Sequence, residues 1–241
     1  MIEAQGIKRT FGKTPVLHGI DVRIGSGEFV AIMGPSGSGK STLLYALSGI
    51  DRPDEGTIKV FGEDITKMRA SELAELRLQR MGFVFQQPRL LSTINLLDNV
   101  VLPGVVAGKE PKEKIVARAQ ELMAQADVAE LVDRDVSQAS GGQLQRVAVC
   151  RALVNSPELL FCDEPTGALN SANAARVLSL IEGEAKRGTT VVMVTHDAAV
   201  AAAADRVLML QDGRVHDDRQ LHGDPAARRA ALAGWLADTA I

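Results

Sequence analysis

A glycine-rich segment, Gly34–Ser41, reads GPSGSGKS and fits the pattern G-x-x-x-x-G-K-S. It follows the apolar run Phe29–Met33 and precedes Thr42–Leu47, which predicts a helix. A loop between a strand and a helix binds phosphate when its glycines let several N–H groups point at the oxygens and the helix adds its positive N-terminal end. Lys40 is then expected to contact the outer phosphates and Ser41 to ligate Mg²⁺. The sequence therefore predicts a nucleoside triphosphate site built from Gly34, Ser36, Gly37, Ser38, Gly39, Lys40, Ser41 and Thr42.

The composition is ordinary for a globular protein, with 46% hydrophobic and 24% charged residues. A net charge of −3 and an isoelectric point near 5.9 argue against a surface that coats nucleic acid. No apolar run approaches the roughly 18 residues that span a bilayer, since Pro103 and Gly104 interrupt the candidate Val100–Val106. The first residues lack a basic stretch followed by an apolar core, so no secretory signal is expected. We therefore expect a cytosolic location, with Cys150 and Cys162 as small core residues.

Two kinds of strand are predicted. Short alternating or β-branched segments between glycine turns indicate a small N-terminal antiparallel sheet, and these are Ile2–Thr10, Val16–Ile24 and Thr57–Phe61. Nearly continuous apolar runs are typical of parallel strands buried on both faces, and these are Phe29–Met33, Leu159–Cys162, Thr190–Val194 and Val207–Leu210. With helical stretches between the runs, we expect an α/β fold whose mostly parallel sheet is flanked by helices.

The middle of the chain is predicted to be helical. After Pro111, apolar residues recur at helical spacing, namely Ile115, Ala119, Leu122, Met123 and Ala126. Further helices are expected at Ser71–Arg80 and Leu96–Leu102. These segments predict a helical subdomain, about residues 88–156, inserted in the core of a single domain of residues 1–222. Residues 223–241 are expected to form a short C-terminal helical tail.

The apolar strand Leu159–Cys162 ends in two carboxylates, Asp163 and Glu164. A lone acidic pair after a strand is common, and the pair gains significance from the phosphate loop in the same chain. Phosphoryl transfer to water needs one carboxylate near Mg²⁺ and a second group that orients or deprotonates the water. Asp163 fits the first role and Glu164 the second.

A second glycine-containing loop, Ser140–Gln143, opens the predicted helix Leu144–Asn155. Such a helix N-terminus can bind an anion, although it can equally be an ordinary helix cap. The chain has one phosphate loop for two candidate anion sites. The economical interpretation is that Ser140, Gly141, Gly142 and Gln143 meet a nucleotide held by another subunit.

Taken together, these residues resemble the nucleotide-binding subunits of ABC transporters from about Ile2 to Arg214. Six elements appear in the family's order, namely Gly34–Ser41 (Walker A), Phe85–Gln87 (Q-loop), Ser140–Gln143 (signature), Leu159–Asp163 (Walker B), Gly167–Asn170 (D-loop) and Thr195–Asp197 (switch histidine). Phe11 stands where the family places an aromatic ring against adenine. The resemblance implies a P-loop NTPase core of the ABC-ATPase type, with ATP and Mg²⁺ as cofactors.

The resemblance also implies roles for single residues. Gln86 would complete the Mg²⁺ shell with Ser41 and Asp163, and would sense a membrane partner. His196 would hydrogen-bond the γ-phosphate and hold the attacking water with Glu164. The catalytic set is then Glu164, His196 and Gln86, although an isolated histidine at a strand end is more often structural.

Two positions depart from the family pattern. The signature is preceded by Ala139 where leucine is usual, at a position that packs rather than touching phosphate. The D-loop ends in Asn170 where aspartate is usual. Asparagine keeps the size and the hydrogen bonding but loses the charge, which leaves the contribution of Asn170 to the active site open.

Longer phrases resemble the lipoprotein-release, macrolide-export and bacitracin-resistance branch, namely Ser48–Gly56, Gly82–Gln87 and Asp163–Leu169. This branch implies an ATPase that dimerises on ATP and drives a permease with a large extracytoplasmic domain from the cytoplasmic face of the inner membrane. The groove for the permease is expected near Pro88–Asn99, and the substrate is not encoded in the chain. The alternative is a cell-division type of ABC ATPase that regulates a membrane partner without transport. A DNA-maintenance type is disfavoured, because Lys40 and Ser140 lie only 100 positions apart without sustained heptads.

Overall fold

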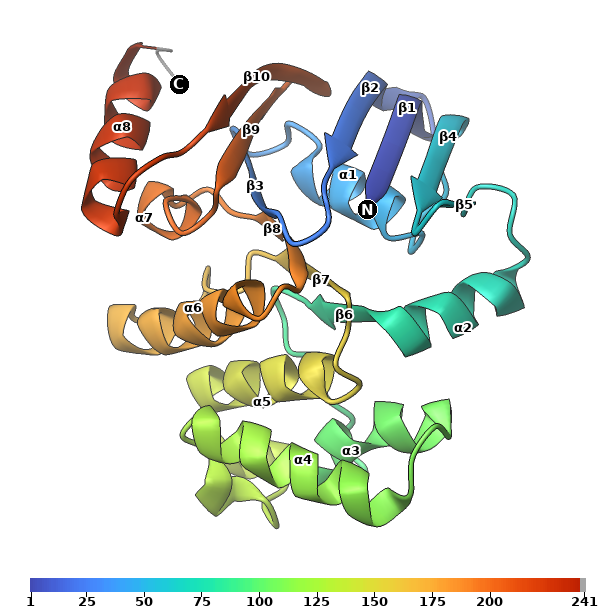
Figure 1. The fold of residues 1–241 in the computed structure, drawn as a ribbon, viewed down its shortest axis with the longest axis vertical. Coiled ribbons are helices and arrows are strands. Elements are labelled where there is room, and N and C mark those ends of the chain that lie inside the picture. The colour runs from blue at the N-terminus through green and yellow to red at the C-terminus, as the bar shows by residue number, and fades with distance from the viewer. Residues whose placement is uncertain (239–241) are drawn as a thin grey trace. The chain divides into compact units, whose positions relative to one another are not determined.

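A computed structural model describes residues 1–238 of the chain (Figure 1). It contains two structural units. The first comprises Met1–Leu73 together with Thr190–Ile241, and the second comprises Ala74–Thr189.

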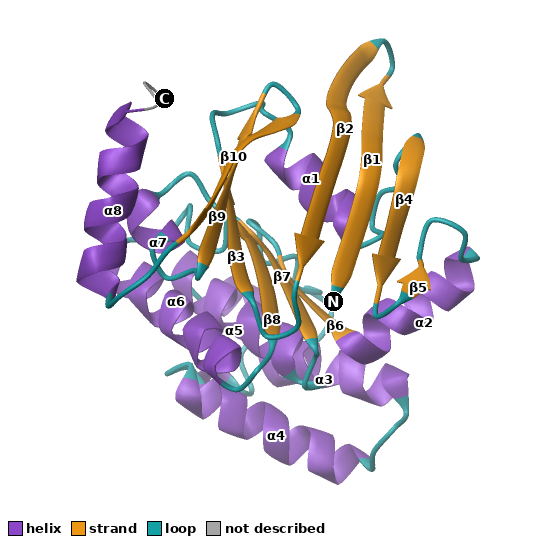
Figure 2. Ribbon diagram, turned by 45° about the horizontal axis from the view of Figure 1, so that its top comes forward, coloured by secondary structure: helices purple, strands orange, loops and turns teal. Residues whose placement is uncertain are grey.

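The first unit contains a four-stranded antiparallel sheet in the order β2-β1-β4-β5, three strands of which stand side by side in Figure 2. Its strands are β1 (Ile2–Phe11), β2 (Thr14–Ile24), β4 (Glu55–Val60) and β5 (Glu63–Asp64). Inward-facing residues of β1, such as Ile2, Ala4 and Ile7, are almost fully buried. The alternating pattern therefore predicted this sheet correctly, because one face lies on the core.

A second group of strands in this unit is mostly parallel. β3 (Phe29–Met33) pairs in parallel with β8 (Thr190–Val194) and with β9 (Arg206–Gln211). β10 (Arg214–Gln220), which the sequence analysis did not predict, is antiparallel to β9. Every residue of β3 and β8 is buried, as continuous apolar runs require. The helices of this unit are α1 (Lys40–Leu47), α7 (Ala198–Ala201) and α8 (Pro225–Asp238), and α2 (Ala70–Arg80) begins in it.

The second unit is mostly helical. Its two strands, β6 (Met81–Val84) and β7 (Leu159–Asp163), are parallel. Its helices are the end of α2, α3 (Leu96–Ala107), α4 (Lys112–Gln125), α5 (Gly141–Leu153) and α6 (Ser171–Lys186), with the short 3₁₀ helices η1 (Ala129–Leu131) and η2 (Val136–Gln138). Figure 1 shows α3, α4 and α5 as neighbouring helices.

Helix α3 corrects one predicted boundary. We expected it to end at Leu102, before Pro103, but it continues to Ala107, where Gly108 closes it in a left-handed conformation. Proline lacks an N–H and costs a helical hydrogen bond, which here is offset by packing. A side chain at Gly104 would lie 2.5 Å from Ile115 of α4, so glycine allows the two helices to approach closely.

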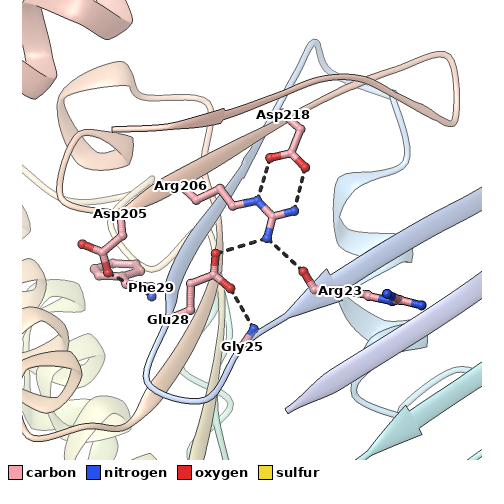
Figure 3. Close-up of polar contacts among 7 residues, drawn as sticks. All are labelled: Arg23, Gly25, Glu28, Phe29, Asp205, Arg206 and Asp218. Atoms are coloured by element: carbon pink, nitrogen blue, oxygen red, sulfur yellow. Dashed lines mark hydrogen bonds and ion pairs between the residues drawn. The ribbon is translucent and has the colours of Figure 1, made fainter. Parts of the chain in front are cut away.

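Arg206, the first residue of β9, connects several segments of the first unit (Figure 3). Its guanidinium donates two 2.6 Å bonds to the carboxylate of Asp218, one of 3.1 Å to Glu28 and one of 2.9 Å to the carbonyl oxygen of Arg23. The hydrogen bonds to Asp218 are the main cause that raises the pKa of Arg206 above its usual value. Since Arg23 lies on β2 and Asp218 on β10, this side chain ties the antiparallel sheet to the β9–β10 hairpin.

Replacing Arg206 with methionine is expected to destabilise the protein by about 2 kcal/mol, because Glu28 is then a mostly buried carboxylate that has lost its cation. Lys8→Met is the matched control, since the Lys8–Glu55 pair is largely exposed and is expected to contribute less than about 1 kcal/mol. The midpoint of urea unfolding, followed by tryptophan fluorescence and circular dichroism, measures both. Equal midpoints for the two variants would contradict a central role for Arg206.

Candidate nucleotide-binding site

The glycine-rich loop lies directly between β3 and α1, as its sequence context predicts. Gly34, Gly37 and Gly39 have φ values of 148°, 80° and 98°, which residues with a side chain rarely adopt. A side chain at Gly34 would also overlap the backbone oxygen of Leu210 on β9. The turn therefore requires all three glycines, and Gly34 is required in addition by close packing on a neighbouring strand.

The residues at the start of α1 fit a phosphate group. The Lys40 ammonium donates to two carbonyl oxygens of the loop itself, those of Gly34 at 2.9 Å and Pro35 at 2.7 Å. The hydroxyl of Ser38 is buried and has no hydrogen-bond partner among the described residues. The first turn of α1 contains no acidic residue, and its N-cap Gly39 supplies no side-chain acceptor. The helix end thus presents a cation and N–H donors, with no acidic residue in its own first turn, which suits an anionic ligand.

The β9–β10 hairpin supports this loop, a contact that the sequence analysis missed. The N–H of Gly213 donates to the carbonyl oxygen of Ser38 at 3.1 Å. The carbonyl oxygen of Gly213 accepts from the backbone N–H of His18 at 2.9 Å. Asp212 and Gly213 both have positive φ, at 47° and 67°, as an Asp-Gly hairpin turn requires. That dipeptide was a signal for the turn, but nothing local indicated that the turn touches the phosphate loop.

Phe11 lies at the end of β1 with its side chain exposed, so it is not a core residue. The guanidinium of Arg9 is 4.8 Å from the centre of its ring. Arg9 is itself paired with Asp51 at 2.7 Å and with Asp54 at 2.8 Å. One ring face is therefore backed by a held cation, an arrangement compatible with stacking of a planar base on the ring.

His196 follows β8 on an exposed turn. The N–H of Asp197 donates to the Thr195 hydroxyl at 3.1 Å, and the Asp197 carboxylate accepts from the N–H groups of Ala199 and Val200 to cap α7. The histidine is thus fixed between a buried strand and a capped helical turn. This local order holds its backbone in place.

In the second unit, the two carboxylates lie at the end of β7. Asp163 is its last residue and is 5% exposed, and Glu164 follows immediately. Glu164 has a φ of 47°, a left-handed conformation that costs a non-glycine residue roughly 1 to 2 kcal/mol. Its carbonyl oxygen accepts from Gly167, and the carboxylate lies 3.4 Å from the position of a side chain at that glycine. This conformation turns the chain sharply at the end of β7, directly after Asp163.

The loop Ser140–Gln143 forms the N-terminus of α5. The Ser140 hydroxyl accepts from the N–H of Gln143, whose side chain accepts from the N–H of Ser140, which makes a capping box. A side chain at Gly142 would lie 2.6 Å from the Asn173 amide on α6.

Asn170 caps α6 by accepting from the N–H of Asn173 at 3.0 Å. A capping role is open to asparagine and aspartate alike, so this departure from the family pattern preserves the helix end.

The candidate residues divide between the two units. The first unit holds Phe11, the loop Gly34–Thr42 and His196, and the second holds Gln86, Ser140–Gln143, Asp163 and Glu164. Gln86 lies on an exposed loop after β6. Within residues 1–238 no group of three or more histidine, cysteine or acidic side chains could hold a metal ion. The predicted Mg²⁺ ligands Ser41, Gln86 and Asp163 are oxygen donors of the kind that completes a shell begun by phosphates.

The order and spacing of these segments match a known family. The pattern that describes the family "ABC transporter" matches residues 17–167, which is more than half of the chain. The chain belongs to the ABC transporter family.

Curated relatives within the family include macrolide export proteins. The cassette is 42% identical over 242 residues to the "Macrolide export ATP-binding/permease protein MacB" of Nitrosomonas europaea, covering 97% of this chain and 37% of that protein. It is 45% identical over 236 residues to the protein of the same name from Rhodopseudomonas palustris, covering 96% and 36%. The chain thus spans little more than a third of the length of these relatives.

Solved ABC cassettes have the same fold. The dimeric structure of MJ0796, described as a bacterial ABC transporter cassette, aligns with a TM-score of 0.87 at 37% identity, over 93% of this chain and all of that one. A second dimer of MJ0796, in a post-hydrolysis state with ADP and Pi, aligns with a TM-score of 0.85 at 34% identity, over the same shares. The predicted ABC-ATPase fold is therefore confirmed. The predicted class, an ABC ATPase with ATP and Mg²⁺ as cofactors, is the class of this family, and the MJ0796 dimer with ADP and Pi shows the hydrolysis products on such a cassette.

Two further observations bear on the sequence predictions. Among the described residues, no helix combines the length and apolar character needed to cross a membrane.

Cys150 and Cys162 are both buried and unpaired, as predicted, and burial raises the pKa of the Cys150 thiol to about 12.

Proposed function

We propose that this cassette is the ATP-hydrolysing part of an ABC transporter that drives a permease with a large extracytoplasmic domain. The observation that carries the proposal is the identity of 42 to 45% to ATP-binding/permease proteins over at least 96% of this chain. Because the match covers only about a third of those relatives, the permease lies either on a separate chain or on a continuation of this one. The cassette then hydrolyses ATP at the cytoplasmic face of the inner membrane.

The phosphate-loop residues bind and orient the nucleotide. Lys40 pairs with the outer phosphates once the ligand displaces its two loop carbonyls, and the Ser41 hydroxyl ligates Mg²⁺. Gly34, Ser36, Gly37, Ser38, Gly39 and Thr42 supply the donors around the phosphates, and Phe11 stacks on the adenine. The unpartnered Ser38 hydroxyl supports this assignment, since a buried polar group without a partner is costly unless a ligand satisfies it.

Glu164 is assigned as the group that polarises the attacking water, and His196 holds that water and the γ-phosphate. Bound Mg²⁺ neutralises charge on the phosphates, and Ser41, Gln86 and Asp163 are assigned to hold it. These roles follow the division of labour in phosphoryl transfer, where positioning and charge stabilisation supply most of the rate.

The proposal includes a dimer of cassettes. Ser140, Gly141, Gly142 and Gln143 of one copy contact the γ-phosphate held by the phosphate loop of the other. ATP then favours the closed dimer and ADP does not, so hydrolysis resets the dimer and the conformational equilibrium shifts with each cycle. The dimeric MJ0796 structures support a dimer of cassettes. The permease is assigned to a groove near Pro88–Asn99.

A pull-down from detergent-solubilised host membranes tests the proposal, with tagged protein, ATP and the slow Glu164→Gln variant. Recovery of a permease with a large extracytoplasmic domain is expected. Recovery of a cell-division type of membrane partner instead would replace transport by regulation of that partner. Recovery of no membrane protein, when the native protein also carries no permease on its own chain, would overturn the coupling and leave an uncoupled ATPase.

A further inference from the structure

The loop that joins β6 to α3, residues 85–95, is held by side chains from two helices. At its start, the Gln145 amide on α5 donates to the carbonyl oxygen of Phe85 at 2.9 Å. Past its middle, the Asn99 amide on α3 accepts from the N–H of Leu91 at 2.7 Å and donates to its carbonyl oxygen at 3.0 Å. Asn99 and Gln145 are 1% and 2% exposed, so these bonds satisfy amides that burial would otherwise penalise.

Arg151 of α5 holds the centre of the same loop. Its two terminal nitrogens donate to consecutive carbonyl oxygens, those of Pro88 and Arg89, each at 2.7 Å. Burial lowers the pKa of Arg151, yet a guanidinium stays protonated at neutral pH. A charged fork that spans two successive carbonyls restrains translation and rotation of the backbone more strongly than a single bond does.

Within the loop, Arg89 packs on Phe85, which belongs to a stack of phenylalanine rings. Arg89, with a φ of 47°, places its guanidinium 4.8 Å from the centre of the Phe85 ring. Phe85 stacks on Phe83 at 6.1 Å, and Phe83 stacks on Phe161 of β7 at 5.5 Å. Phe161 lies two residues before Asp163. Between these anchors the side chains of Gln86 and Gln87 remain exposed.

We infer that Arg151, assisted by Gln145, is a positioning residue that fixes the loop carrying Gln86 to the helix that begins at Ser140. Helix α5 runs from Gly141 to Leu153 without interruption, so it connects its capped N-terminus to the loop contacts as one rigid element. Movement of the Ser140 end therefore moves the backbone around Gln86. The inference rests on the proposed function only in giving Gln86 its role at Mg²⁺.

Arg151→Ala is expected to release the loop without removing a residue that touches the nucleotide. In the nucleotide-free protein, amide hydrogen exchange in residues 85–91 is expected to become about tenfold faster, since two charge-assisted bonds are lost. The half-saturating Mg²⁺ concentration for ATP hydrolysis is expected to rise about tenfold, as when a group that orients a metal ligand is removed. Nucleotide affinity measured without Mg²⁺ should stay unchanged.

Two further variants make the test decisive. Arg151→Lys keeps the charge but not the fork, and is expected to fall between the wild type and Arg151→Ala in both readouts. It also replaces Arg151→Ala if that variant fails to fold. Arg80→Ala is the matched control, because it removes another guanidinium from the second unit. The Nε atom of Arg80 donates to the Glu158 carboxylate at 2.6 Å, and Arg80 precedes β6 whereas the loop follows it. This control is expected to lower stability while leaving exchange in residues 85–91 and the Mg²⁺ dependence unchanged.

The two possible failures are distinguishable. Unchanged loop exchange in Arg151→Ala and Arg151→Lys overturns the inference, whatever the ATPase activity. Equal shifts in the Arg80→Ala control also overturn it, because they indicate a general loss of stability. A wild-type protein that hydrolyses no ATP overturns the proposed function, and loop exchange then decides the inference alone.

Discussion

Glu164→Gln is expected to lower ATP turnover by about 10²- to 10⁴-fold, the usual contribution of a positioned general base. The substitution keeps the size of the side chain and its position at the end of β7 but removes the group that accepts or polarises the proton of water. ATP should still bind, because the phosphate loop is untouched. The protein is therefore expected to accumulate as an ATP-bound dimer.

Phosphate release at saturating ATP measures turnover, and light scattering with and without ATP measures the dimer. Glu121→Gln is the matched control, since it makes the same change of charge at an exposed position of α4 in the same unit and should leave both unchanged. Turnover within a factor of two of the wild type would exclude Glu164 as the base. Loss of turnover without a dimer would retain the base but make dimerisation dependent on the permease.

Lys40→Ala is expected to weaken ATP binding by about 10²- to 10⁴-fold, because hydrogen bonds to charged groups contribute roughly 1.5 to 3 kcal/mol each and about two are lost. Lys40 is buried, and its ammonium is held by the carbonyl oxygens of Gly34 and Pro35. It therefore already lies inside the loop, and little rearrangement is needed to bind phosphate.

Titration with a fluorescent ATP analogue and Mg²⁺ measures this affinity, and thermal unfolding checks that the variant is folded. Lys59→Ala removes the same charge from an exposed position of β4 in the first unit and is expected to bind ATP like the wild type. Retained affinity in a folded Lys40→Ala protein would contradict the assignment of the loop.

Several features followed from local sequence because their causes are local. The three glycines of the phosphate loop have the positive φ values that only glycine adopts freely, and the continuous apolar runs Phe29–Met33 and Leu159–Cys162 predicted β3 and β7. Ser140 and Gln143 are three positions apart, which is the spacing of a capping box. Phe11 was singled out only through the family resemblance, and its ring is exposed in the structure.

Other features depend on contacts between distant segments. The continuation of α3 beyond Pro103 depends on close packing of Gly104 against α4, which no local pattern records. β10 is mostly exposed and polar, and it forms because it pairs with β9. Arg151 reads as a surface residue of an amphipathic helix, yet it binds the backbone of a loop more than sixty positions away in the chain.

By itself the sequence determined the family, the nucleotide and the chemical groups available for hydrolysis, because those properties reside in short segments whose backbone and side chains act together. The tertiary structure decided what holds these segments in place, namely Gly213 beneath the phosphate loop, Arg206 between the sheet and the hairpin, and Arg151 behind the loop of Gln86. Each of these contacts joins residues that are far apart in the chain, so it arises from packing and buried hydrogen bonding of the folded protein rather than from local propensity.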